Sequence, residues 1–226
     1  IIATGSIWIA FLLHRLFYSN PVLNLFSVFI LWLPFEFELY ETSIDTELPI
    51  TFAMIILVFY SIYFIFSNQN NDFFDSYRLS LSDFKIAVTG FIMLVLTIVP
   101  IGIGIGFLNF NLFEPSVGFF LNSLLVGYFL VALPEELLFR YLMTKLLHPF
   151  INRQSLLLIV TAVIFGLAHL NNQAIGFNLN WGYAGLATIA GLGYGWVFFR
   201  TNKVAAAALT HMLINFTWAL FFNSPY

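Results

Sequence analysis

Long apolar runs separated by short polar breaks cover most of the chain. A helix needs roughly 20 apolar residues to cross a bilayer, and several runs are close to that length. The strict apolar–polar alternation of a transmembrane β-barrel is missing, so helices are the remaining way to satisfy backbone groups in lipid. The pattern predicts an all-α, polytopic transmembrane helix bundle with about eight spans, at residues 1–18, 21–37, 50–66, 85–107, 117–147, 155–170, 182–200 and 203–222.

The composition also indicates a membrane protein. Of the 226 residues, 61% are hydrophobic and 8% are charged, whereas soluble domains carry about 25% charged residues. A net charge of -3 gives no basic excess, so we expect no nucleic-acid partner. The chain has no cysteine, which excludes disulfides and thiolate metal sites. Residues 1–13 follow no basic stretch and are interpreted as part of a span, not as a signal peptide.

The charges in the breaks predict an orientation. The eight basic residues lie in or beside the breaks after the first, third, fifth and seventh spans, at Arg15, Arg78, Lys85, Arg140, Lys145, Arg153, Arg200 and Lys203. The other breaks are acidic or neutral. Because basic loops stay in the cytoplasm, we expect the odd-numbered breaks there and both termini outside. No linker or internal repeat divides the chain, which predicts a single membrane domain over residues 1–226.

Charged residues are concentrated late in the fifth span, where each costs about 2.5–3.5 kcal/mol. Pro134 removes a backbone hydrogen bond, so we expect the helix to kink or restart there. Glu135 and Glu136 would then lie in a first helical turn, which favours negative charge. Glu136 and Arg140 share a helix face and are expected to pair. Glu135 is turned away by roughly 100° and stays available for chemistry.

Two histidines lie in other spans. Phe165 and His169 come at the end of the sixth span, and His211 and Asn215 are one turn apart in the eighth. At about 1.5 Å per residue, Glu135, His169 and Asn215 lie about 18–21 Å from the predicted cytoplasmic helix ends, and His211 about 12 Å. We therefore expect these residues to meet in one layer near mid-membrane.

A carboxylate and two histidines in a poorly hydrated layer suit general acid–base catalysis. In such a layer a glutamate can take a proton from a water molecule that a histidine holds. His211 and Asn215 can donate hydrogen bonds to the oxyanion that forms when water attacks a carbonyl. This layout predicts peptide hydrolysis.

The three groups of residues also resemble a known set of motifs. In this order, and on separate spans, the chain carries Glu135-Glu136-x-x-x-Arg140, Phe165-x-x-x-His169 and His211-x-x-x-Asn215. The ordered set resembles the CAAX-processing and bacteriocin-processing (CPBP, Abi) family of intramembrane proteases. The resemblance covers about residues 85–222, the expected protease core, and leaves 1–84 as N-terminal spans of variable type.

The resemblance implies an eight-helix bundle with glutamate-dependent endopeptidase activity. It implies that Glu135 is the general base, that His169 helps to activate water, and that His211 and Asn215 stabilise the oxyanion. The expected supporting residues are Glu136, Arg140 and Phe165. The implied substrate is a membrane-associated peptide or protein, and the composition suggests a bacterial cell membrane. The sequence predicts neither the identity of the substrate nor the oligomeric state.

Other readings stay open. His169, His211 and Glu135 would also suit a zinc site, although no His-Glu-x-x-His occurs, so we expect no cofactor and keep zinc as the alternative. A non-catalytic immunity factor or scaffold would keep the same residues for structure. A proton-coupled transporter would use the carboxylates as a relay, but the expected repeat of broken helices is missing. The glycines at 191, 193 and 195 predict a close-packing face of one helix.

Overall fold

The computed structural model describes residues 2–17, 20–36, 59–61, 75–111, 115–171 and 179–223. Its main helices are α1 (Ile2–Phe17), α2 (Pro21–Glu36), α5 (Leu81–Gly104), α6 (Val117–Val126), α9 (Gln154–Leu167), α10 (Trp181–Thr201) and α11 (Val204–Phe221). The predicted all-α fold is confirmed. Two residues, Asn109 and Phe110 (β1), pair antiparallel with Phe222 and Asn223 (β2) and join the end of α5 to the end of α11.

The helices follow the predicted spans closely wherever the structure describes them. The predicted span at 50–66 and the acidic break before it lie almost wholly outside the described residues. Helix α5 begins four residues earlier than predicted, because Ser80 and Asp83 form a capping box at its N-terminus. Within the described residues, three helices are long and apolar enough to cross a membrane, Leu81–Gly104, Val117–Leu147 and Val204–Phe221. The protein is therefore an integral membrane protein, and the number of spans stays a prediction.

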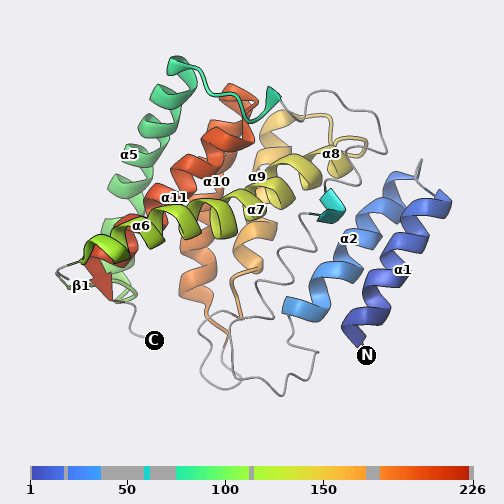
Figure 1. Ribbon diagram of the computed structural model, residues 1–226, viewed down its shortest axis with the longest axis horizontal. Helices are drawn as coiled ribbons and strands as arrows, with labels where there is room; N and C mark the ends of the chain where they lie inside the picture. Colours follow the sequence, from blue (N-terminus) through green and yellow to red (C-terminus); the bar gives the residue numbers. More distant parts are fainter. Residues whose placement is uncertain are drawn as a thin grey trace.

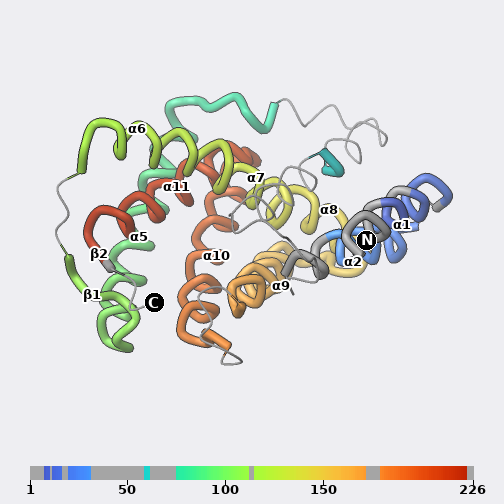
Figure 2. The backbone as a smooth tube through the Cα atoms, turned by 60° about the horizontal axis from the view of Figure 1, so that its bottom comes forward, coloured from blue at the N-terminus to red at the C-terminus, as the bar shows by residue number. Residues whose placement is uncertain are grey.

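Helix α10 is the centre of the bundle. It packs against α9, α5 and α11, and Figure 2 shows it between α5 and α9. A left-handed residue, Asn202 (φ 53°), ends α10 and allows α11 to begin two residues later. Helices α1 and α2 lie side by side at one end of the molecule, where α2 contacts α8 (Met143–Leu147) (Figure 1).

The glycines of α10 permit close approach on more than one side. A methyl group at Gly191 would lie 3.2 Å from Ala162 of α9, and one at Gly193 would lie 2.6 Å from the Leu94 side chain of α5. Gly195 also faces α9, through Leu158. The prediction of a single packing face is wrong, because residues two apart on a helix lie on opposite sides. The glycines instead let α10 pack tightly between two neighbours.

One unbroken helical path runs from Val117 to Leu147. After α6 it passes through a π-helical segment, η1 (Gly127–Ala132), then α7 (Leu133–Glu136), a second π-helical segment, η2 (Leu137–Leu142), and α8. The expected restart at Pro134 does not occur, because the residues flanking α7, Ala132 and Leu137, keep right-handed helical dihedrals. Widened turns on both sides accommodate the missing backbone donor. Such π-helical turns often mark functional sites.

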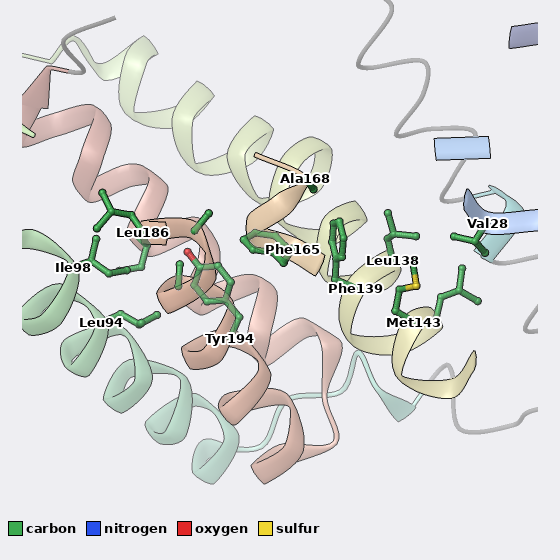
Figure 3. Packing of buried hydrophobic residues seen from close by; sticks show 14 of the residues in the cluster. Val28, Leu94, Ile98, Leu138, Phe139, Met143, Phe165, Ala168, Leu186 and Tyr194 are labelled. Atoms are coloured by element: carbon green, nitrogen blue, oxygen red, sulfur yellow. The ribbon is translucent and has the colours of Figure 1, made fainter. Parts of the chain in front are cut away.

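Aromatic side chains fill the core between these helices. Phe165 of α9 lies between Tyr194 of α10 and Phe139 of η2, and meets both rings edge-on (Figure 3). All three side chains are buried. The core therefore brings the middle of α10 and the last turn of α9 against the helix that carries the two glutamates.

Candidate active site

Glu136 and Arg140 form an ion pair inside the bundle. Nε of Arg140 lies 3.0 Å from Oε2 of Glu136, and both side chains are fully buried. The Arg140 guanidinium also lies over the Phe165 ring, 4.9 Å from its centroid, in a cation–π contact. Removing either charge would leave the other buried and uncompensated. The pair therefore fixes the position of the Glu136 carboxylate.

Glu136 in turn holds His211, which α11 supplies. Nδ1 of His211 lies 3.0 Å from Oε1 of Glu136. A carboxylate beside an arginine accepts hydrogen bonds, so Nδ1–H donates to it. The other ring nitrogen, Nε2, lies 3.9 Å from Oε2 of Glu135. His211 thus lies between the two glutamates and presents a different nitrogen to each.

Glu135 keeps a free oxygen in a buried place. Its Oε2 atom has no hydrogen-bond partner among the described residues, and its side chain is 12% exposed. A buried oxygen without a partner is costly, which makes it ready to accept a hydrogen bond from a ligand. Two atoms 3.9 Å apart can both bond one water molecule at about 2.8 Å. The geometry between Glu135 and His211 therefore suits a bound water.

His169 presents one defined nitrogen to the site. Helix α9 ends at Leu167, and His169 lies in the turn that follows it. Its Nδ1 atom lies 2.8 Å from the carbonyl oxygen of Phe165. Because a carbonyl only accepts, Nδ1 carries the hydrogen, and Nε2 of the neutral ring keeps its lone pair for another partner. The rings of Phe165 and Tyr183 contact this imidazole and restrict its rotation.

A small void connects the three motif residues that come from α9 and α11. His169, His211 and Asn215 line a void of about 40 Å³, together with Tyr183 and Trp218. A water molecule needs about 10–15 Å³ of such space, so the void accommodates one. Glu135 does not line this void but contacts His211, which does. The histidine in contact with Glu135 is His211, whose Nε2 lies 3.9 Å from Oε2 of Glu135.

Tyr194 belongs to the site, although sequence reasoning did not single it out. Its ring stacks on the His211 imidazole, with centroids 4.4 Å apart and planes at 12°. Phe165 meets the same imidazole edge-on, at 5.8 Å. The stack and the bond to Glu136 together fix the plane of His211. The available signal was a large aromatic residue among the glycines of α10.

The zinc alternative depends on three ligands around one point. Within the part of the chain that the structure describes, no group of three His, Asp or Glu residues is arranged to hold a metal ion. Nδ1 of His211 is bonded to Glu136 and Nδ1 of His169 to a carbonyl, so each ring has only Nε2 left for a metal. The arrangement does not fit a three-ligand metal centre, and we derive no step through one.

Part of the chain matches a family of known proteins. Residues 117–217 match the family model described as "Type II CAAX prenyl endopeptidase Rce1-like". No curated protein and no solved structure matches the chain. The matched segment contains every candidate site residue, from Glu135 to Asn215, and it includes Tyr194. The ordered motifs, the buried site and this match lead to one conclusion: residues 117–217 form an Rce1-like segment, and the protein is an intramembrane protease.

Proposed function

We propose that this protease hydrolyses a peptide bond of a membrane-associated protein or peptide with a glutamate-activated water molecule. The observation that carries the proposal is the position of His211. It bonds the ion-paired Glu136 through Nδ1 and faces the unpartnered Oε2 of Glu135 through Nε2. A water molecule beside Glu135 would have a base and a histidine within reach.

The first step begins with Glu135. Its carboxylate takes a proton from water while Nε2 of His169 accepts the second water hydrogen and orients the molecule. The hydroxide adds to the carbonyl carbon of the scissile bond, and the carbonyl oxygen becomes an oxyanion. The arrangement requires a substrate carbonyl in the void beside His211 and Asn215.

His211 and Asn215 stabilise that oxyanion. The Asn215 amide donates through Nδ2–H, and protonated His211 donates through Nε2–H. When the intermediate collapses, the carbon–nitrogen bond breaks and the leaving amine takes the proton from Glu135.

The family name points to CAAX-type C-terminal segments as the substrate class, and we propose it for this chain. We also propose that the loops rich in Lys and Arg face the cytoplasm of a bacterial cell. One cavity is lined by Lys145, near the end of the predicted span 117–147, and by Lys203, at the start of the predicted span 203–222, so both lie at the same end of the bundle. This common end supports the orientation.

Alanine variants test the function. Glu135→Ala and His169→Ala should abolish cleavage of a membrane-anchored CAAX peptide, while both proteins insert and unfold at the wild-type temperature. Normal cleavage by both variants would refute the glutamate mechanism. If the protein is a scaffold or immunity factor, cells that carry either variant should instead have the wild-type phenotype.

A further inference from the structure

A second cavity lies on the other side of the Glu136–Arg140 pair. It has a volume of about 580 Å³, and Arg140 and Thr144 form part of its wall. The remaining wall comes from the helix ends and turns at the basic end of the bundle, including Asp75, Lys145, Asn202 and Lys203. None of the catalytic candidates lines this cavity.

Arg140 reaches this cavity with unused donors. Its side chain is completely buried, and neither Nη1 nor Nη2 has a hydrogen-bond partner among the described residues. The guanidinium offers five N–H donors in a planar fork that matches the two oxygens of a carboxylate. The contact with Glu136 is made through Nε, at 3.0 Å. Two parallel donors therefore remain for a ligand.

Thr144 supplies a second unused donor one turn further along. Seven other helical threonines bond the carbonyl four residues earlier: Thr89, Thr97, Thr161, Thr188, Thr201, Thr210 and Thr217. The buried hydroxyl of Thr144 has no partner in the described part of the chain. The preceding turn is π-helical, which shifts the carbonyl that it would otherwise use. Its hydroxyl is free to bond a ligand in the cavity.

The charges around the cavity favour an anion. Lys145 and Lys203 supply positive charge, since Glu136 balances that of Arg140. Asp75 is the one carboxylate among the described residues of the wall. Asp75 is near Arg78, at 3.9 Å, on the exposed side. Lys145 contacts Tyr141 through a hydrogen bond and its ring face, which holds the ammonium in place. The cavity therefore has a positive balance and two unpartnered buried donors.

We propose that this cavity binds the free C-terminal carboxylate of the peptide substrate, with Arg140 as bidentate donor and Thr144 as a third donor. The proposal rests on the proposed function. Arg140 follows Glu135 by five residues on one helix, which is roughly 7.5 Å along the axis. That is the length of about two extended peptide residues. A CAAX substrate has three residues after its cysteine, about 10 Å when extended, so a chain held by its carboxylate at Arg140 is long enough to reach the proposed base.

The experiment compares two probes, a fluorogenic prenyl-cysteine CAAX peptide with a free carboxylate and the same peptide as C-terminal amide. Wild-type protein should cleave the acid with a kcat/KM about tenfold higher than that for the amide, because the acid makes stronger hydrogen bonds as a charged group. The difference should appear as a lower KM for the acid. Thr144→Val should lower the acid-to-amide ratio about threefold or more. Thr161→Val is the matched control, because its buried hydroxyl is bonded within α9, and should keep the wild-type ratio.

Binding to the Glu135→Gln protein separates this proposal from the proposed function. Tighter binding of the acid than of the amide by this protein supports the carboxylate site, even if the wild type cleaves neither peptide. Equal cleavage and equal binding of acid and amide would overturn the site while leaving the protease mechanism intact. Activity that depends on an anionic lipid but does not differ between the acid and the amide would also overturn the carboxylate site. The cavity would then bind a lipid headgroup instead.

Discussion

Nε2 of His211 lies 3.9 Å from Oε2 of Glu135, while Nδ1 of the same ring is bonded to Glu136 at 3.0 Å. One imidazole therefore connects the two adjacent glutamates, which have different surroundings. Glu136 is neutralised by Arg140, and Oε2 of Glu135 is left without a partner among the described residues. This difference fits our proposal that Glu136 has a structural role and that Glu135 is the base.

The Glu136–Arg140 pair predicts a large loss of stability when one partner is removed. Arg140→Met should lower the free energy of unfolding by about 3–5 kcal/mol, because the Glu136 charge stays buried without compensation. The Glu136→Gln/Arg140→Met double variant should recover most of that loss. Reversible unfolding in detergent micelles measures both. A single variant as stable as the wild type would show that the pair is not a structural element.

The stack of Tyr194 on His211 predicts a graded effect on turnover. Tyr194→Phe keeps the ring and should change kcat by less than about twofold. Tyr194→Leu loses the stacking, which contributes about 0.5–1.5 kcal/mol, and should lower kcat by up to about tenfold. Steady-state cleavage assays compare the two variants, with unfolding temperature as control. Equal kcat values for Phe and Leu would remove Tyr194 from the site.

Two glycines of α10 form a matched pair for testing close packing. A methyl group at Gly193 would overlap Leu94, whereas one at Gly185 meets no atom within 4 Å. Gly193→Ala should destabilise the protein by about 1–3 kcal/mol, and Gly185→Ala should be neutral or slightly stabilising. Unfolding in detergent checks both. Leu94→Ala combined with Gly193→Ala should relieve part of the overlap, and an unchanged stability of Gly193→Ala alone would contradict the packing.

Metal removal is predicted to leave the activity in place. The site histidines direct their Nδ1 atoms to Glu136 and to the Phe165 carbonyl, and no three ligands converge in the described residues. Dialysis against a strong chelator should change kcat/KM by less than about twofold, since a glutamate base needs no metal. Loss of activity on chelation, with recovery on adding zinc, would favour the zinc alternative.

Much of the fold was predictable from the sequence because lipid imposes a simple rule. Apolar runs of sufficient length must be helices, so α1, α2, α5, α10 and α11 begin and end within a few residues of their predicted bounds. The motif residues could also be placed on their spans. Their spacing predicted that Glu136 and Arg140 share a helix face, and the two side chains are 3.0 Å apart.

The details of the site could not be predicted, for geometrical reasons. The π-helical segments beside α7 change the rotation per residue, which a helix of constant pitch does not describe. The contact between His211 and both glutamates depends on how α11 packs against α7, which no local pattern determines. The stacking of Tyr194 likewise requires the close approach of α10 to α11.

The central claim is that Glu135 is the catalytic base, and the turnover of Glu135→Gln tests it most directly. This change keeps the size of the side chain and removes its ability to accept the proton of water. We predict that kcat falls by about 10²–10⁴-fold, with membrane insertion and unfolding temperature unchanged. A kcat within about threefold of the wild type, measured on the same folded protein, would contradict the account.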